Sequence, residues 1–213
     1  ITTPANFDSM IEFMREKILP ELKGQETVIM AMSLGGMIAK RWDELYPEDF
    51  KKLVLVNTSF KGINKLTKRL QPQSIKAFGK LFMTPGVEER ELGILRMVSN
   101  NWSEHTRILK EWVEIQKDAP VSRKSFINQI RAALSYSPGA ESPNADILFL
   151  AAKKDRLCSY HCSEELQKLW GGRLELHPTA GHDLPIDDGP WLAEKLRNLF
   201  EPLVKVIMLG RHA

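Results

Sequence analysis

Apolar residues recur at helical spacing near the start of the chain, at Phe7, Ile11, Met14 and Ile18. This spacing predicts an amphipathic helix that Asn6 or Asp8 caps and that stops at Pro20. Residues 26–32 then form a short, mostly apolar run of strand length, and a helical pattern follows over residues 34–45. The chain therefore begins with a helix, a strand and a second helix.

Residues 52–57 (KLVLVN) are dense in valine and leucine, which is typical of a strand covered on both faces. From residue 58 to about residue 142 helical spacing recurs and no convincing strand appears, so this stretch is a helical insertion. The pattern after the insertion predicts a strand over 146–152, a helix over 163–170, a strand over 173–177, a loop over 179–186 and a closing helix from Pro190 to about residue 203. The last ten residues, 204–213, have no clear assignment.

Strands separated by helices imply right-handed crossovers and a parallel sheet, so the fold class is α/β. Residues 1–59 and 141–213 would form the α/β core. Residues 60–140 would form a helical insertion between two of its strands.

Composition and charge exclude several classes of protein. The 213 residues are 43% hydrophobic and 27% charged, which is enough apolar content for one core. Thirty basic and 27 acidic residues leave a net charge of only +3, which disfavours a nucleic-acid binder. The longest nearly apolar run, residues 28–39, is too short to span a bilayer. Cys158 and Cys162 have no distant partner, which favours a reducing compartment, and we expect a soluble, cytoplasmic protein.

Ser33 lies between a predicted strand and a predicted helix, in the sequence AMSLGG at residues 31–36. A sharp turn of this kind needs small residues two positions before and two positions after the serine, and Ala31 and Gly35 occupy those positions. The motif differs by one methyl group from the Gly-x-Ser-x-Gly nucleophile elbow. Serine-glycine turns that merely cap helices are common, so the motif alone leaves both readings open.

An acidic residue and a histidine follow Ser33 in the chain, each just after a predicted strand. Asp155 lies in KKD after the strand over 146–152, and His182 lies in AGHD after the strand over 173–177. Because active groups of open α/β sheets gather beyond the carboxyl ends of the strands, these side chains are expected at one edge of the sheet.

With the elbow, the acid and the histidine in this order, the chain resembles the α/β-hydrolase superfamily over roughly residues 5–203. The resemblance implies an α/β-hydrolase fold, with helices on both faces of a mostly parallel sheet. It also implies that residues 60–140 are the variable helical cap of that family.

The resemblance further implies a serine hydrolase that cleaves a carboxylic ester or thioester. Ser33 would attack the acyl carbon, His182 would act as its base and Asp155 would orient the imidazole. The main-chain N–H of Leu34 would be one donor of the oxyanion hole. No cofactor is implied.

One departure from the family concerns the N-terminal side of the elbow. Only 32 residues precede Ser33, whereas the family has further strands and a loop with the second oxyanion donor in that region. We expect an N-terminally incomplete chain that lacks the first strands, and we expect the elbow strand to present an unpaired edge.

Two other functions stay open at this point. An acyltransferase would pass the same acyl group to an alcohol or thiol instead of water. A non-catalytic binding module on a degenerate hydrolase fold is the third possibility, which the missing oxyanion segment favours and the retained Ser33, Asp155 and His182 disfavour.

Several other residues invite a functional interpretation. Trp102 and Trp112 could line a substrate pocket, although tryptophans are more often core residues. Cys158, His161 and Cys162 could share one helical face, but a fourth ligand with metal-site spacing is missing, so we expect no metal.

Five further residues have ordinary structural interpretations. His177 is expected to end a strand and Asp183 to brace the histidine loop. Asp187 and Asp188 are expected to cap the final helix, and His105 is expected to be solvated.

Residues 61–80 carry six basic residues and no acidic one, namely Lys61, Lys65, Lys68, Arg69, Lys76 and Lys80. Such a segment near a capped site could bind an acidic acyl-carrier partner or steer an anionic substrate. The alternative is a solvated basic helix without a partner. Otherwise the expected partner is a small ester or thioester substrate, with no nucleic acid and no membrane span.

Overall fold

A computed structural model describes residues 3–22, 26–197 and 205–209 of the chain. Its centre is a five-stranded parallel sheet with the strand order β4-β3-β2-β1-β5. The strands are β1 (Thr27–Met32), β2 (Lys52–Val56), β3 (Asp146–Ala152), β4 (Arg173–His177) and β5 (Lys205–Leu209). The four strands predicted from the apolar runs are therefore confirmed, within one residue at their ends.

The strand β5 lies in the tail that the sequence pattern left unassigned. Thr27 of β1 pairs with Lys205 of β5, while Val28 of β1 pairs with Lys52 of β2 on the other side. The expectation that the elbow strand presents an unpaired edge is therefore wrong, because β1 has a parallel neighbour on each side. The pairing partner is remote in the sequence, so a local pattern could not reveal it.

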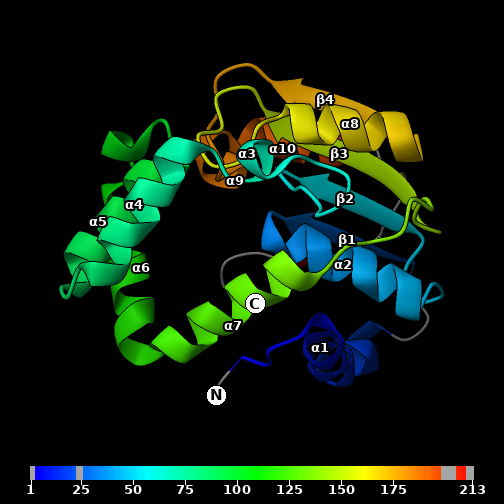
Figure 1. Cartoon of the computed structure of the whole chain (residues 1–213), viewed down its shortest axis with the longest axis horizontal. Helices are drawn as coiled ribbons and strands as arrows, with labels where there is room; N and C mark the ends of the chain where they lie inside the picture. The colour runs from blue at the N-terminus through cyan, green and yellow to red at the C-terminus, as the bar shows by residue number, and fades with distance from the viewer. Residues whose placement is uncertain (1–2, 23–25, 198–204, 210–213) are drawn as a thin grey trace.

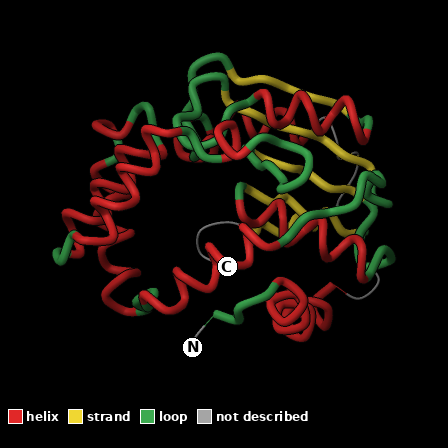
Figure 2. The backbone as a smooth tube through the Cα atoms, viewed as in Figure 1, coloured by secondary structure: helices red, strands yellow, loops and turns green. Residues whose placement is uncertain are grey.

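Helices cover both faces of the sheet, as the resemblance implies (Figure 2). On one face a single apolar cluster joins the strands to α1 (Phe7–Leu22), α2 (Leu34–Leu45) and α8 (His161–Trp170). On the other face the strands pack against α9 (Leu184–Asp187) and α10 (Gly189–Arg197). Burial on both faces explains the almost continuous apolar sequence of β2 and β3.

The structure refines several predicted helix boundaries. Pro20 lies inside α1, which continues to Leu22, so the prediction that it stops the helix is wrong. The side chain of Asn6 accepts a hydrogen bond from the N–H of Ser9 at 2.9 Å, as expected of a cap. The predicted loop over 179–186 contains the start of α9. The predicted end of the closing helix near residue 203 lies outside the described residues.

The insertion between β2 and β3 is helical, as the spacing predicts. Its elements are α3 (Leu66–Arg69), α4 (Pro72–Met83), α5 (Val87–Val98), the 3₁₀ turn η1 (Trp102–Glu104), α6 (Thr106–Asp118) and α7 (Arg123–Ser135). In Figure 1 the helices α4, α5 and α6 stand together to one side of the sheet, and α7 returns toward α2.

A third apolar cluster holds this insertion to the core. It contains Leu95 and Trp112 from α5 and α6 together with Leu157 from the loop after β3, and Ile186 of α9 packs against it. The insertion therefore rests largely on the loops that follow the strands, while Ala132 of α7 joins the apolar cluster on one face of the sheet. Among the described residues, none of the helices has both the length and the apolar composition needed to cross a membrane.

Two helical glycines give a matched test of the packing at the start of α2. A Cβ on Gly36 would lie 2.6 Å from Thr58 Oγ1, whereas a Cβ on Gly79 in α4 would meet no atom within 4 Å. Gly36→Ala should lower the free energy of unfolding by about 2 kcal/mol through overpacking. Gly79→Ala should raise it by up to about 1 kcal/mol, because alanine favours the helix. Urea denaturation of both variants measures the difference, and equal effects would contradict the crowding of Gly36 by Thr58.

Candidate active site

Ser33 occupies the turn between β1 and α2, with φ 54° and ψ −117°. A positive φ is costly for a residue with a side chain, so the surrounding contacts must hold it in place. The N–H of Ser33 donates to the carbonyl of Val56 at 2.8 Å, and the hydroxyl of Thr58 donates to the carbonyl of Ser33 at 2.6 Å. Residues at the end of β2 therefore clamp the turn on both sides of the serine.

Asp155 and His182 meet in the structure, although 27 residues separate them in the sequence. The distance from His182 Nδ1 to Asp155 Oδ2 is 2.7 Å, and the two side chains are 7% and 0% exposed. The other carboxylate oxygen of Asp155 accepts the N–H groups of Leu157 at 2.7 Å and Cys158 at 3.0 Å. The loop after β3 thus fixes the orientation of the carboxylate, and the carboxylate in turn fixes the imidazole.

The surroundings of His182 raise its pKa above the ordinary value of 6.5. Burial alone would lower this pKa, because it penalises the charged ring. The negative charge of Asp155, its hydrogen bond to the ring and the charge of Asp183 together outweigh the effect of burial. His182 is therefore a stronger base than an isolated histidine, as a proton acceptor for a hydroxyl requires.

Asn57 joins the loops that follow β2, β3 and β4, and the sequence pattern predicted no role for it. It follows β2 directly, is buried, and has a φ of 45°. Its Nδ2 donates to the carbonyl of His182 at 2.7 Å, and its Oδ1 accepts from the N–H of Ala152 at 2.8 Å. The signal that would have found it is a polar residue directly after a buried strand, the same signal that singled out Asp155.

Ser33 reaches this cluster through the backbone. Its N–H binds the residue just before Asn57, and Asn57 holds the carbonyl of His182. Among the described residues, no hydrogen bond joins the Ser33 hydroxyl to the imidazole of His182. Catalytic hydrogen bonds are often long or poorly aligned in proteins without substrate, so this contact stays a prediction.

The other predicted site residues are Leu34, Trp102 and Trp112. Leu34 begins α2, so its N–H is one of the free donors at the helix start. Trp112 is buried in the apolar cluster of the insertion. Trp102 packs against the same cluster, with the guanidinium of Arg96 4.5 Å from its ring centre.

His177 ends β4 and Asp188 caps α10, as expected. The Nδ1 of His177 accepts from the N–H of Ala180 at 2.8 Å, and its Nε2 donates to Asp188 at 3.1 Å. Asp188 also accepts from the N–H of Trp191 at 2.9 Å.

Two expectations about polar residues are wrong. His105 is not solvated: its side chain is 16% exposed, and its Nε2 lies 3.9 Å from a carboxylate oxygen of Asp187. Asp187 does not cap the final helix, because its side chain is 1% exposed and binds residues around Ser99 and Gly181.

Cys158, His161 and Cys162 do not share one helical face, because Cys158 precedes α8. His161 is half exposed and binds Glu164 at 2.6 Å, while both cysteines are buried. A hydrogen bond with Cys162, together with burial, raises the pKa of the Cys158 thiol well above its ordinary value. The part of the chain that the structure describes contains no cluster of three or more acidic, histidine or cysteine side chains suited to a metal.

Two members of the basic segment at residues 61–80 have structural contacts. Lys68 binds Glu165 at 2.5 Å, and Arg69 donates to the carbonyl of Ala133 at 3.0 Å. Glu165 raises the pKa of Lys68 through this contact. The exposed positive charge of the segment is therefore smaller than the sequence suggests, and an acidic acyl-carrier partner stays a prediction.

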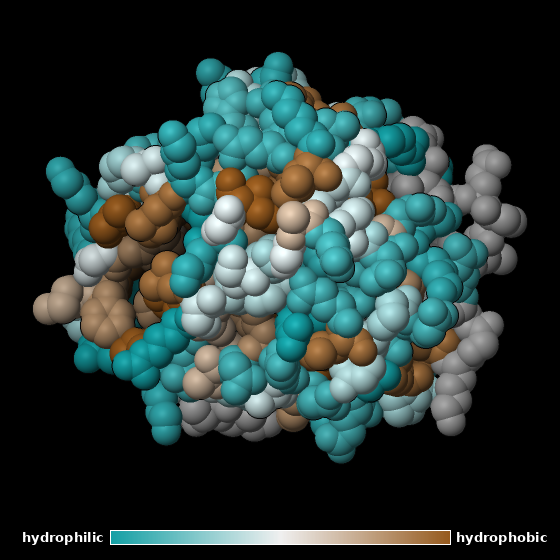
Figure 3. Space-filling model, turned by 45° about the vertical axis from the view of Figure 1, so that its right-hand side comes forward, coloured by the Kyte–Doolittle hydropathy of each residue, from teal (hydrophilic) through white to brown (hydrophobic). Residues whose placement is uncertain are grey.

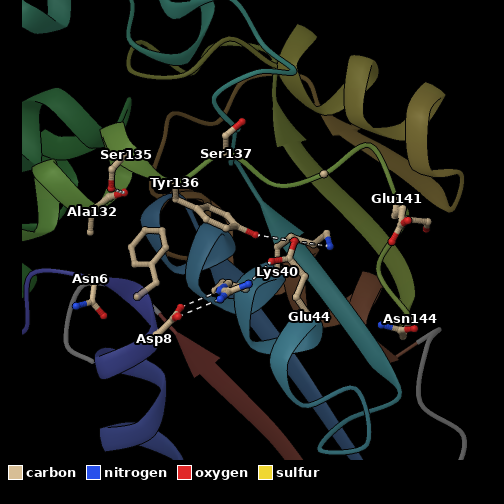
Figure 4. Close-up of a pocket in the computed structure, with 14 residues that line it drawn as sticks. Asn6, Asp8, Lys40, Glu44, Ala132, Ser135, Tyr136, Ser137, Glu141 and Asn144 are labelled. Carbon is tan, nitrogen blue, oxygen red and sulfur yellow. Dashed lines mark hydrogen bonds and ion pairs between the residues drawn. The ribbon is translucent and has the colours of Figure 1, made fainter.

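A polar pocket of about 720 Å³ lies elsewhere, between α1, the second half of α2 and the end of α7 (Figure 4). Four of its charged side chains form ion pairs: Lys40 binds Glu44 at 2.9 Å, and Arg41 binds Asp8 at 2.8 Å. Lys40 lies seven residues after Ser33 along α2, about 10 Å at the rise of an α-helix. This pocket is separate from the cluster around His182.

Solved structures with the same architecture include several hydrolases. An esterase from Thermogutta terrifontis is 15% identical with a TM-score of 0.67, over 93% of this chain and 73% of that chain. An esterase from Exiguobacterium antarcticum is 20% identical with a TM-score of 0.70, over 92% and 74%. An α/β hydrolase fold protein from Chitinophaga pinensis is 19% identical with a TM-score of 0.72, over 95% and 74%. At these identities the likeness shows the α/β-hydrolase fold.

A comparison with curated protein sequences finds no match. A family model does match the chain, over residues 5–189, and it is the hydrolase family described as "Serine aminopeptidase, S33". Because this match covers well over half of the chain, the protein belongs to that family of α/β-hydrolases.

Proposed function

We propose that this protein is a serine hydrolase that cleaves a carboxylic ester or thioester through an acyl-serine intermediate. The observation that carries the proposal is the buried hydrogen bond of 2.7 Å between His182 Nδ1 and Asp155 Oδ2. It leaves Nε2 as the nitrogen that can accept a proton from a nucleophile. The strained backbone of Ser33 supports the serine as that nucleophile.

The proposed reaction has two steps. In the first, Ser33 Oγ attacks the acyl carbon while His182 Nε2 takes the hydroxyl proton, and the N–H of Leu34 donates to the developing oxyanion. The imidazolium then protonates the departing alcohol or thiol. In the second step, water attacks the acyl-serine, and His182 takes its proton and returns it to Ser33. Asp155 keeps its negative charge throughout and stabilises the imidazolium.

We also propose that residues 60–140 form a cap over this site. The insertion rests on the loops that carry Asp155 and His182, through Leu157 and Ile186. Exposed apolar side chains lie on two of its helices, Ile75, Phe82 and Met83 on α4 and Ile127, Ile130 and Leu134 on α7. Figure 3 shows apolar residues around a hollow at the left of the view. These features favour a substrate with an apolar acyl group.

A fluorophosphonate probe tests the nucleophile directly. The wild-type protein should be labelled at Ser33, and Ser33→Ala and His182→Ala should each abolish labelling, because the serine is inert without its base. The matched control is Ser137→Ala, which removes an exposed serine that binds the carbonyl of Lys61 and should label like the wild type. An unlabelled wild-type protein, or labelling retained by Ser33→Ala, would contradict the proposal.

Once labelling has identified the nucleophile, unlabelled protein allows kinetics on esters, thioesters and an aminoacyl amide, since the family description names an aminopeptidase. Ser33→Ala and His182→Ala should each lower kcat on the order of 10⁵-fold, and their combination should cost little more, because the two groups act as a unit. Additive losses would argue against a shared mechanism. Products formed with and without an added alcohol or thiol distinguish a hydrolase from an acyltransferase.

The pH dependence tests the role of Asp155. Neutral His182 is the active base, so kcat/KM should rise as pH increases through the raised pKa of His182. Asp155→Asn removes the charge that raises this pKa and leaves burial as the main influence, so the rising limb should move to lower pH. The same variant should lower kcat on the order of 10³-fold, a milder loss than that of Ser33→Ala. If the rising limb of kcat/KM stays at the wild-type pH in Asp155→Asn, Asp155 is excluded as the partner of His182.

Asn57 gives a further test, because it holds both loops through its amide. Asn57→Asp keeps the size and the oxygen that accepts from Ala152, but it replaces the donor to the carbonyl of His182 with an acceptor. We expect kcat to fall about 10- to 100-fold and the free energy of unfolding to fall by about 1–3 kcal/mol. Steady-state kinetics together with urea denaturation measure the two effects, and a loss of stability with unchanged kcat would exclude a positioning role.

A further inference from the structure

Asp187 is a buried carboxylate that the mechanism above does not use. Its side chain is 1% exposed, and its two oxygens accept four hydrogen bonds. Oδ2 accepts from the N–H of Gly181 at 2.5 Å and of Asn100 at 3.0 Å. Oδ1 accepts from the hydroxyl of Ser99 at 2.5 Å and from the N–H of Asn101 at 3.4 Å. The carboxylate therefore joins the loop of His182 to the segment after α5.

The backbone on both sides of His182 depends on this segment, which we call the 98–101 brace. The N–H before His182, that of Gly181, binds Asp187, and the N–H after it, that of Asp183, donates to the carbonyl of Val98 at 2.8 Å. Gly181 also packs directly against the brace, because a Cβ there would lie 2.7 Å from the carbonyl oxygen of Val98. Both sequence neighbours of His182 are thus held through their N–H groups.

The same brace contacts the loop of the catalytic acid. Arg156, the neighbour of Asp155, donates to the carbonyl of Ser99 at 2.8 Å. The side chain of Asn100 donates to the carbonyls of Lys154 at 3.3 Å and Thr179 at 2.9 Å. The 98–101 brace therefore bridges the loops of Asp155 and His182, in addition to the bridge that the Asn57 side chain makes.

The chemistry at position 187 requires a carboxylate. All four hydrogen-bonding partners are donors, so an amide of the same shape would turn its NH₂ group toward donors on one side. A buried charge is costly, and the four hydrogen bonds compensate that cost. Helix capping does not explain the residue, because Asp188 already accepts from the N–H of Trp191.

We propose that Asp187 is a positioning residue that holds His182 against Asp155 by anchoring its loop to the 98–101 brace. Since the brace continues α5, the insertion and the catalytic base form one mechanical unit. Displacing the insertion from the core would move His182 as well. This inference rests on the proposed function for its kinetic consequence, but the placement of the His182 ring can be measured without any activity.

The test compares two isosteric substitutions at buried carboxylates. Asp187→Asn disrupts the anchor. Asp43→Asn is the matched control. Asp43 lies on α2, is also fully buried, and accepts from the N–H groups of Asn144 at 2.8 Å and Ala145 at 3.1 Å. Both variants should lower the Tm. Only Asp187→Asn should lower kcat, by about 10- to 100-fold, with KM changed less than about twofold. Here kcat is calculated per serine that reacts with the fluorophosphonate.

Histidine NMR titration supplies the readout that a purely structural role would not change. As His182 moves away from Asp155, the raised pKa of its ring should fall in Asp187→Asn and stay at the wild-type value in Asp43→Asn. Ser99→Ala removes one of the four donors and keeps the charge, so it should shift kcat and the pKa of His182 in the same direction by a smaller amount. Ser99→Ala also tests the anchor if Asp187→Asn fails to fold.

Two results would overturn the inference: a His182 pKa unchanged in Asp187→Asn, or equal losses of kcat in Asp187→Asn and Asp43→Asn. If Ser99→Ala is the variant that folds, an unchanged pKa of His182 in it counts equally against the anchor. A wild-type protein that the fluorophosphonate does not label would refute the proposed function, while the titration of His182 would still decide the role of Asp187.

Discussion

The parallel register of β1, β2 and β3 is the constraint on which the rest of the structure depends. Because these strands run in the same direction, the turns that follow Met32, Val56 and Ala152 emerge at one edge of the sheet. Their backbone polar groups are buried there and must find partners within the protein. Asn57 satisfies one of them by accepting from the N–H of Ala152, and it also donates to the carbonyl of His182 in the loop after β4. Its left-handed backbone is the local cost of that arrangement.

Burial gives the candidate site its electrostatic character. The hydrogen bond between Asp155 and His182 is almost completely shielded from water, so the interaction between the two is stronger than at the surface. The same shielding makes an unsatisfied oxygen costly, and the N–H groups of Leu157 and Cys158 saturate the second oxygen of Asp155. Asp187 follows the same rule with four donors. The buried carboxylates of Asp155 and Asp187 thus connect loops of the chain, and backbone N–H groups hold each of them in place.

The insertion is connected to the site more closely than a separate module would be. Apolar packing through Leu157 and Ile186 attaches it to the loops of Asp155 and His182. Hydrogen bonds of the 98–101 brace also fix the orientation of the insertion relative to these loops, because each one joins a defined donor to a defined acceptor. Packing and hydrogen bonding therefore couple the placement of a surface insertion to that of a buried histidine.

The sequence by itself determined the local elements and the order of the chemical groups. Apolar runs located the strands β1 to β3, because a strand covered on both faces must be apolar throughout. Alternation of polar and apolar residues located β4, which lies at the edge of the sheet. Ser33, Asp155 and His182 were found because each stands just beyond a strand, where a parallel sheet gathers its loops. Only the tertiary structure decided the rest. It placed β5 beside β1, left His105 only partly exposed, and bound Asp187 to the N–H of Gly181 where the local pattern indicated a helix cap. These contacts join residues that are distant in the sequence or that lie within loops, and no local pattern encodes which partner a buried polar group will meet.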